Sequence, residues 1–260
     1  MQVLFYIFLA LLPAIVLLAF ILWRDRLRPE PARELVLACL LGLLSVPIAQ
    51  LGSSVLSGFY SESLSSWQSC LGTAFLGAAI PEEFGKLLIL WVFFRWRRHQ
   101  NEVMDGIVYA VCIGLVFAAY ENVGYVWRSM GMEYLYETES LALVTSVLRA
   151  LTAVPAHFCF AVIMGFFFSM YMFGSKRRWI FLLLSFLAPA LFHGLYDFLA
   201  FLEGISDLWL GVITFLFFLV FFAMNNLCIK TIRAAIKIDD NAYELAAKKN
   251  APEGDGNSAL

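Results

Sequence analysis

Long apolar stretches recur along this chain of 260 residues and constrain its fold more than any other feature. A helix needs about 20 apolar residues to cross a hydrocarbon core of about 30 Å. Stretches of that length lie at 1–23, 35–57, 70–94, 103–127, 141–173, 179–202 and 209–229. Hydrophobic residues make up 62% of the chain and charged residues 15%, which excludes an ordinary soluble domain. The sequence therefore predicts an all-α polytopic membrane protein with about seven transmembrane helices, the fifth long enough to be tilted, kinked or partly interfacial.

Basic residues are concentrated in alternate connections and predict the orientation of the chain. They follow the first, third and fifth stretches as Arg24, Arg26, Arg28 and Arg33, then Arg95, Arg97 and Arg98, then Lys176, Arg177 and Arg178. Further basic residues follow residue 229, whereas 58–68 and 203–208 contain none. Because cytoplasmic connections carry an excess of positive charge, we expect the N-terminus outside and the C-terminus in the cytoplasm. The first stretch is expected to be a retained helix, because its basic residues come after the apolar run.

Two adjacent carboxylates, Glu82 and Glu83, lie near the middle of the third stretch. An ionisable side chain at that depth costs roughly 2.5–3.5 kcal/mol on insertion scales, so it faces the protein interior and marks a functional site by default. Lys86 lies four residues after Glu82 and three after Glu83, a spacing that lets it reach either carboxylate on a helix. This group is the first candidate for function.

Later stretches contribute polar groups at a comparable depth. They are Glu121 and Asn122 in the fourth, Arg149 and His157 in the fifth, and His193 and Asp197 in the sixth. Counting from the ends of each stretch places the two histidines near the midplane with the glutamate pair, and Glu121 and Asp197 further toward the outside. The i, i+4 spacing lets Asp197 orient the His193 imidazole. We expect these groups to share one cavity.

Some of these residues also have purely structural interpretations. Arg149 is expected to be a structural counter-charge or a snorkelling residue, and Glu121 can serve either as a buried partner of Arg149 or Lys86 or in the chemistry. Pro81, Pro155 and Pro189 each precede a polar residue of the group by one to four positions, and each can open the helix backbone or simply pack.

Two hydrolytic mechanisms suit this group of side chains. In the first, Lys86 keeps one carboxylate ionised as a water-activating base, and the two histidines stabilise an oxyanion or donate a proton. In the second, His157, His193 and Glu83 hold a zinc ion with an open position, which lowers the pKa of its bound water. The residues alone leave both mechanisms open.

Four strings in this region resemble motifs of the PrsW-type intramembrane proteases. They are PEEFGKLL at 81–88, which fits the EExxK motif, GLVFAAYEN at 114–122, HFCFAVIMG at 157–165, and HGLYDF from His193. The four occur in order, each on its expected helix, across about residues 80–200. That family is similar to the CAAX-type prenyl proteases and to bacteriocin-processing membrane proteases.

The resemblance implies an intramembrane endopeptidase, with Glu82 or Glu83 as the base and His157 and His193 at the oxyanion. It also implies a single-span, anti-sigma-factor-like protein as the substrate, cleaved near the outer membrane face. Lys86, Glu121, Asn122 and Asp197 would have supporting roles. Asp197 stands where the CAAX-type enzymes typically carry Asn, and an ionised Asp is a poorer oxyanion donor but a better group for orienting a histidine.

Two other classes compete with a protease. Buried charges are also typical of a proton- or ion-coupled transporter, although the stretches do not divide into matching halves. A membrane sensor with a catalytically silent site is the third reading. The sequence has no HExxH, GxSG or GxGD motif of other membrane proteases.

The expected organisation is one transmembrane domain over residues 1–229, with its catalytic core at about 70–202. Residues 230–260 form a polar cytoplasmic tail that we expect to be partly disordered. The protein is expected to cross the cell membrane several times, with the lipid bilayer around it and no nucleic-acid partner.

Overall fold

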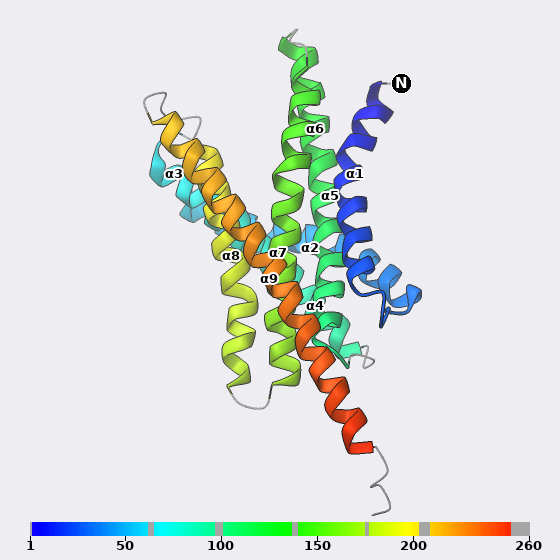
Figure 1. Ribbon diagram of the computed structural model, residues 1–260. Helices are drawn as coiled ribbons and strands as arrows, with labels where there is room; N and C mark the ends of the chain where they lie inside the picture. Colours follow the sequence, from blue (N-terminus) through cyan, green and yellow to red (C-terminus); the bar gives the residue numbers. More distant parts are fainter. Residues whose placement is uncertain are drawn as a thin grey trace, which may run out of the picture.

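The computed structural model describes residues 2–61, 65–96, 101–136, 140–174, 177–202 and 209–250, and within these ranges it is helical with no strand (Figure 1). The long helices are α1 (Gln2–Arg24), α2 (Ala32–Leu56), α4 (Ile80–Trp96), α5 (Val103–Tyr136), α7 (Ala153–Phe173), α8 (Arg178–Leu202) and α9 (Leu210–Asn250). The shorter elements are η1 (Ser57–Phe59), α3 (Trp67–Gly72), η2 (Thr73–Ala79) and α6 (Leu141–Leu151). The prediction of an all-α membrane protein is confirmed.

Six helical stretches of the described chain are long and apolar enough to cross a membrane. They are Val3–Arg24, Ala32–Phe59, Val103–Tyr136, Leu141–Phe173, Arg178–Leu202 and Leu210–Lys249. The stretch expected at 70–94 is helical, but it is divided among α3, η2 and α4 and contains three charged residues, so it is not one of the six. The count of seven, and the side on which each terminus lies, stay predictions.

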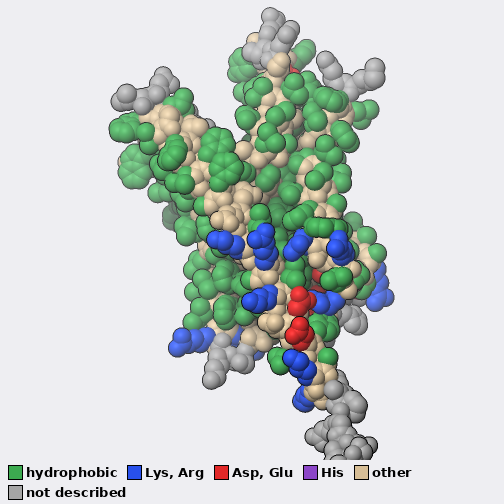
Figure 2. Space-filling view, in the orientation of Figure 1, with side chains coloured by type: hydrophobic (Ala, Val, Ile, Leu, Met, Phe, Trp, Pro, Cys, Tyr) green, Lys and Arg blue, Asp and Glu red, His purple; other side chains and the backbone are tan. Residues whose placement is uncertain are grey.

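Charge is distributed unevenly along the long axis of the molecule. Figure 2 shows Lys and Arg side chains from the middle of the molecule downward, whereas the upper half of the view is covered by hydrophobic side chains. This is the distribution that the alternating connections predicted, although Arg97, Arg98 and Lys176 lie outside the described residues. We call the two regions the basic end and the apolar end.

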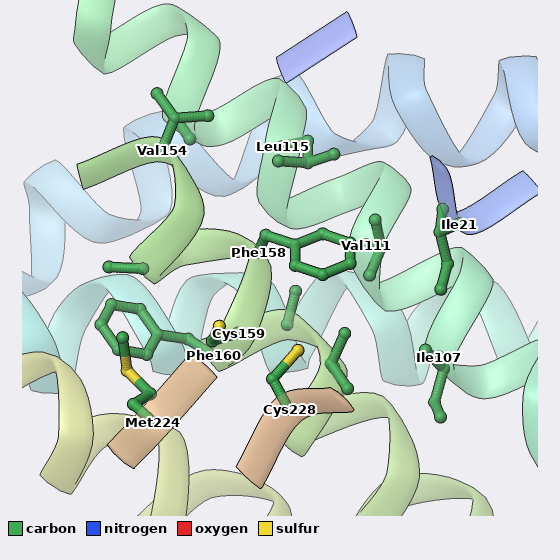
Figure 3. Packing of buried hydrophobic residues seen from close by; sticks show 14 of the residues in the cluster. Ile21, Ile107, Val111, Leu115, Val154, Phe158, Cys159, Phe160, Met224 and Cys228 are labelled. Carbon is green, nitrogen blue, oxygen red and sulfur yellow. The ribbon is translucent and has the colours of Figure 1, made fainter. Parts of the chain in front are cut away.

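Helices α5 and α7 form the centre of the bundle, and α1, α2, α8 and α9 surround them (Figure 1). The central pair approaches very closely, because a Cβ atom at Gly165 of α7 would overlap the backbone of Gly106 and Ile107 of α5. Around this contact lies a hydrophobic cluster that includes residues of α1, α5, α7 and α9 (Figure 3). Its labelled members are Ile21, Ile107, Val111, Leu115, Val154, Phe158, Cys159, Phe160, Met224 and Cys228. The close packing fixes the relative positions of the two helices that carry Glu121 and His157.

The helix that carries the glutamate pair is irregular just before it. Residues 73–79 form the π-helix η2, and the amide of Ile80 donates to the carbonyl of Phe75, five residues back. Pro81 follows directly and has no amide hydrogen to donate. A wide turn of this kind often occurs at functional sites in helices. The wide turn therefore lies immediately before Glu82 and Glu83.

The fifth predicted stretch is indeed interrupted. Helix α6 ends at Leu151 and α7 begins at Ala153, and between them Thr152 has φ −123° and ψ −59°. Pro155 falls in the first turn of α7, where a missing amide hydrogen costs no helical hydrogen bond. Pro189 lies inside α8 and is buried. Of the three alternatives expected for residues 141–173, the structure shows a break in the helix at Thr152.

Helix α9 continues through the boundary expected at residue 230 and reaches Asn250. Its last part folds against the start of α5, where both carboxylate oxygens of Asp239 accept backbone N–H groups, from Val103 at 2.8 Å and Met104 at 2.9 Å. Residues 251–260 lie outside the described chain. The division into a membrane domain and a partly disordered tail stays a prediction.

A group of polar side chains at the basic end, which we call the end cluster, consists of Arg28, Glu102, Asp239, Asp240 and Tyr243. Arg28 donates to Glu102 at 2.6 Å and to Asp240 at 2.9 Å, and the Tyr243 hydroxyl donates to Glu102 at 2.7 Å. The end cluster ties the connection after α1 and the start of α5 to the last turns of α9.

Candidate functional site

The polar residues predicted to share a cavity come together from four helices. We call them the central cluster: Glu82, Glu83 and Lys86 from α4, Glu121 from α5, His157 from α7, and His193 and Asp197 from α8. The glutamate pair lies in the first turn of α4 directly after η2, and Glu83, Lys86, His157 and His193 are almost fully buried.

Glu83 is held by two partners through a single oxygen. Its Oε1 accepts a hydrogen bond from Lys86 Nζ at 2.8 Å and lies 2.9 Å from His193 Nδ1. The side chain has no exposed surface. A buried carboxylate needs such charged or donating partners, because the desolvation of a lone charge is very costly. Glu83 is therefore the carboxylate engaged in the ion pair.

Glu82 is held more loosely than its neighbour. Its Oε2 lies 3.5 Å from Lys86 Nζ and 3.8 Å from His193 Nε2, both beyond the usual length of a hydrogen bond. That oxygen is buried, yet no group in the described part of the chain forms a hydrogen bond with it. The side chain keeps 12% of its surface exposed. Glu82 is thus the carboxylate that remains free to receive a proton.

The contacts of His157 determine its tautomer. Its Nδ1 lies 3.1 Å from Lys86 Nζ, and its Nε2 lies 3.0 Å from Glu121 Oε2. An ammonium group has no acceptor lone pair, so Nδ1 accepts from Lys86 and the Nε2 N–H donates to Glu121. Glu121 therefore contacts His157 directly, in addition to its contact with Arg149.

His193 is oriented by carboxylates on both sides of its ring. Besides the contact of Nδ1 with Glu83, its Nε2 lies 3.3 Å from Asp197 Oδ2. The ring stacks on Phe160 with centroids 4.7 Å apart and an interplanar angle of 16°, and it meets the His157 ring edge-on at 5.0 Å. The contact predicted from the i, i+4 spacing of His193 and Asp197 is present.

Arg149 and Asn122 lie beside the central cluster, next to Glu121. Arg149 Nε donates to Asn122 Oδ1 at 2.9 Å, and its Nη2 lies 3.5 Å from Glu121 Oε2. Asn122 Nδ2 in turn donates to the carbonyl of Ala10 on α1 at 2.7 Å. The expected counter-charge role of Arg149 fits these contacts, and Asn122 links it to α1.

Two spaces adjoin Glu82. A small cavity of about 40 Å³ is lined by Glu82, Glu121, Arg149, His157, His193 and Asp197 together with aromatic and alanine side chains. A polar cavity of this size can hold an ordered water. A groove of about 570 Å³ lies between α2 and α5 and also includes Glu82 and Glu121 in its lining. The two carboxylates therefore face both a space for water and a much larger space.

The cluster also has the donors of a metal site. Glu82, Glu83, His157 and His193 each place one ligand atom within 4.8 Å of the others. Imidazole and carboxylate are the ligands of many catalytic zinc sites. Within the described chain, Oε2 of Glu82 and Oε2 of Glu83 are buried and form no hydrogen bond. The residues present thus fit a bound metal ion.

Sequence reasoning missed the aromatic residues around the site. Phe160 stacks on His193, and the Lys86 ammonium lies 4.1 Å from the centroid of the Phe117 ring. Both have a weak signal in the sequence, because Phe160 is three residues after His157 and Phe117 is four before Glu121. The many phenylalanines of the chain hide this spacing.

Comparison with known proteins gives a consistent set of relatives. A family described as PrsW family intramembrane metalloprotease matches residues 30–224. Proteins named Protease PrsW are similar to this chain, and three of them are those of Clostridioides difficile, Geobacillus kaustophilus and Bacillus subtilis. The first is 32% identical over 197 residues, which cover 75% of this chain and 79% of the relative. The second is 34% identical over 187 residues, 72% of this chain and 76% of the relative. The third is 31% identical over 216 residues, 82% of this chain and 90% of the relative. No solved structure matches the chain significantly.

Proposed function

The chain belongs to the PrsW family of intramembrane metalloproteases of the cell membrane, and from this premise we propose that it hydrolyses a peptide bond through a water activated by Glu82. The observation that carries this proposal is the position of Glu82 between the small cavity and the groove. A water in the cavity and a substrate carbonyl in the groove would both lie beside the same carboxylate.

The contacts assign a different task to each carboxylate. Glu83 is engaged with Lys86 and His193, whereas Glu82 Oε2 has only long contacts with them. We assign Glu82 as the general base that takes a proton from water as its oxygen attacks the carbonyl carbon. The same proton then passes to the amide nitrogen as the carbon–nitrogen bond breaks, so the products are a carboxylic acid and an amine.

We assign the two histidines to the developing oxyanion; because the one N–H of His157 donates to Glu121, that ring must exchange this contact for the oxyanion during the reaction. Both line the small cavity and both are buried, which makes a hydrogen bond to a developing charge stronger than in water. Glu121 orients His157 and Asp197 orients His193. Lys86 compensates the charge of the glutamate pair from a position 2.8 Å from Glu83.

A metal ion would be held by His193, Glu83 and His157, with Glu82 left as the base, and His157 would have to give up either its proton at Nε2 or the hydrogen bond from Lys86 at Nδ1 to ligate it. When bound, a zinc ion would lower the pKa of its water and polarise the substrate carbonyl. That the metal ion is zinc is part of the proposal. In either case Lys86 and Asp197 perform the same tasks, charge compensation at Glu83 and orientation of His193.

The proposed substrate is a single-span membrane protein, and an anti-sigma-factor-like protein is the candidate implied by the resemblance of the motifs. Purified protein should be tested on a pool of single-span reporter proteins whose flanking segments at the apolar end are randomised. Wild-type protein should release two fragments from part of the pool. Full cleavage retained after Glu82→Ala, Glu83→Ala and His157→Ala, each made singly, would exclude the assignment.

Metal content separates the two versions of the mechanism. The purified protein should be dialysed against a chelator, its bound metals measured by mass spectrometry, and its activity assayed before and after zinc is added back. Loss of cleavage that zinc restores supports the metal-bound version. Full activity in metal-free protein would remove the metal from the proposal and leave Glu82 and the histidines as the catalytic groups.

A further inference from the structure

We propose that the groove between α2 and α5 receives, from the side of the bundle, an unwound stretch of the substrate at the apolar end of its membrane segment; this inference rests on the proposed function. Residues of α2, η2, α4 and α5 line the groove. Among them are Gln50 and Ser53 of α2, Glu82 of α4, and Glu121 and Gly124 of α5. The groove's volume of about 570 Å³ is that of a typical ligand site and fits a few residues of extended chain.

The groove has the form of a wedge between two helices. The helices are tightly packed at Gly42, where a Cβ atom would lie 3.0 Å from the Cα of Ile113. Two turns further along α2, Gln50 and Ser53 line open space, as does Gly124 across from them on α5. Tyr120 and Trp127, which also line the groove, are 51% and 64% exposed. The groove therefore opens on the lateral surface of the bundle.

The floor of the groove leads directly to the catalytic group. Glu82 and Glu121 line both the groove and the small cavity that contains the two histidines. A peptide carbonyl placed at this floor would have the proposed base on one side and the proposed oxyanion donors behind it. The groove thus presents a substrate to the side of Glu82 that faces away from the centre of the bundle.

A substrate must lose its helical structure before it can be cleaved here. In a helix each carbonyl is hydrogen-bonded to an amide four residues on and is surrounded by side chains. Unwinding in lipid exposes backbone groups, at a cost of several kcal/mol each, and is tolerated only where protein or water satisfies them. The Gln50 amide, the Ser53 hydroxyl and the Glu121 carboxylate give the groove such polar groups. An exclusively apolar groove would not stabilise extended chain in this way.

Gly124 makes the proposal testable without disturbing the fold. A Cβ atom built at Gly124 meets no atom within 4 Å, so a larger side chain there would extend into the groove. Gly131, seven residues further along the same helix, is also open but does not line the groove. On the opposite wall, Gln50 lines the groove, whereas its neighbour Leu51 is 68% exposed and does not. The chain therefore offers a matched pair of positions on each wall.

The experiment compares Gly124→Leu with Gly131→Leu, and Gln50→Trp with Leu51→Trp, on the reporter pool. We expect kcat/KM to fall by about tenfold or more for Gly124→Leu and Gln50→Trp, because the scissile bond can no longer reach its place beside Glu82. The two control variants should cleave as the wild type does. Thermal unfolding and size-exclusion profiles of all four variants check that they are folded.

A second readout does not depend on cleavage. A photoreactive side chain is introduced at position 124, or at 131, of the Glu82→Gln protein, and cross-linking to the reporters is measured. Preferential capture at 124 supports the groove. If the wild type cleaves the reporters and Gly124→Leu is as active as Gly131→Leu, the groove is not the substrate site, whereas the proposed function stands. Capture at 124 without any wild-type cleavage would overturn the proposed function but leave the groove as a polypeptide-binding site; equal capture at both positions would overturn the groove.

Discussion

The central cluster and the end cluster both pair carboxylates with a basic side chain, but they differ in how completely the carboxylate oxygens are hydrogen-bonded. In the end cluster, Arg28 bridges Glu102 and Asp240, and both oxygens of Asp239 accept backbone N–H groups. In the central cluster, Glu82 and Glu83 each keep one buried oxygen that forms no hydrogen bond with the described residues, and a cavity adjoins Glu82.

This difference separates a structural role from a chemical one. Polar groups that connect chain segments are stable when their hydrogen bonds are complete, because a buried unsatisfied group costs about 1–3 kcal/mol. A site that must bind water, substrate or metal needs some polar atoms that do not already form hydrogen bonds within the protein. The pairing of acidic with basic side chains does not distinguish the two clusters, whereas the buried oxygens without a hydrogen bond and the adjoining spaces do.

The largest expected effect is that of Glu82→Gln on catalysis. Because the amide cannot accept the proton of water, we expect kcat for reporter cleavage to fall by about 10²–10⁴-fold, with little change in the unfolding temperature. Asp240→Asn in the end cluster, which is 50% exposed, should leave kcat unchanged. Equal losses of kcat in the two variants would remove the distinction between the clusters.

Lys86→Met should mainly affect stability. It removes the ammonium that lies 2.8 Å from Glu83 and 3.1 Å from His157, and loss of one partner of a buried ion pair costs about 3–5 kcal/mol. Chemical unfolding in detergent measures this change. The double variant Lys86→Met with Glu83→Gln should be more stable than Lys86→Met alone, since no uncompensated carboxylate remains at Glu83. A double variant that is less stable would contradict the ion-pair assignment.

Asp239→Ala should have a smaller effect that leaves catalysis intact. It removes the acceptor for the first amides of α5, and loss of an N-terminal cap costs about 0.5–2 kcal/mol. An unfolding temperature lower by roughly 2–4 °C per kcal/mol is expected, with kcat per folded molecule unchanged. Asp239→Asn, which keeps one acceptor oxygen, should lie between Asp239→Ala and the wild type.

Asp25 gives the smallest expected effect and a pH dependence. It directly follows α1, and burial, with Glu30 and Glu102 nearby, raises the pKa of its carboxyl to about 7. The folded state thus binds this proton more tightly than the unfolded chain, so the stability it contributes is present at low pH and is lost as pH rises through about 7. Asp25→Asn should raise the unfolding temperature by a few degrees at pH 8 and flatten its dependence between pH 4 and 7. A pH profile that matches the wild type would contradict this.

The sequence predicted those parts of the site that depend on spacing within one helix. The Glu83–Lys86 and His193–Asp197 contacts both follow from positions three and four residues apart. The contact of His157 with Glu121 could be expected only in general terms. It depends on the rotation of α7 against α5, which is set by packing such as that of Gly114 against Ala161.

Features that depend on long-range packing could not be predicted. Asp239 contacts amides that lie 135 and 136 residues away in the sequence, and its spacing within a polar stretch gave no sign of this. The π-helix at 73–79 likewise has no residue signature, because a wide turn is maintained by its surroundings and not by local propensity. The long apolar stretches predict the helices, whereas tertiary contacts determine where those helices become irregular.

The wide turn of η2 also determines how α3, which precedes it, is rotated about the helix axis relative to α4, which follows it. A regular α-helix advances by about 100° and 1.5 Å per residue. Deleting one residue from Thr73–Ala79 would therefore rotate the capped start at Ser66 by about 100° relative to Glu82 and draw it inward. A change between π and α geometry would have the same screw-like action. The geometry of this one turn therefore determines how the segment that begins at Ser66 is oriented relative to the carboxylates inside the bundle.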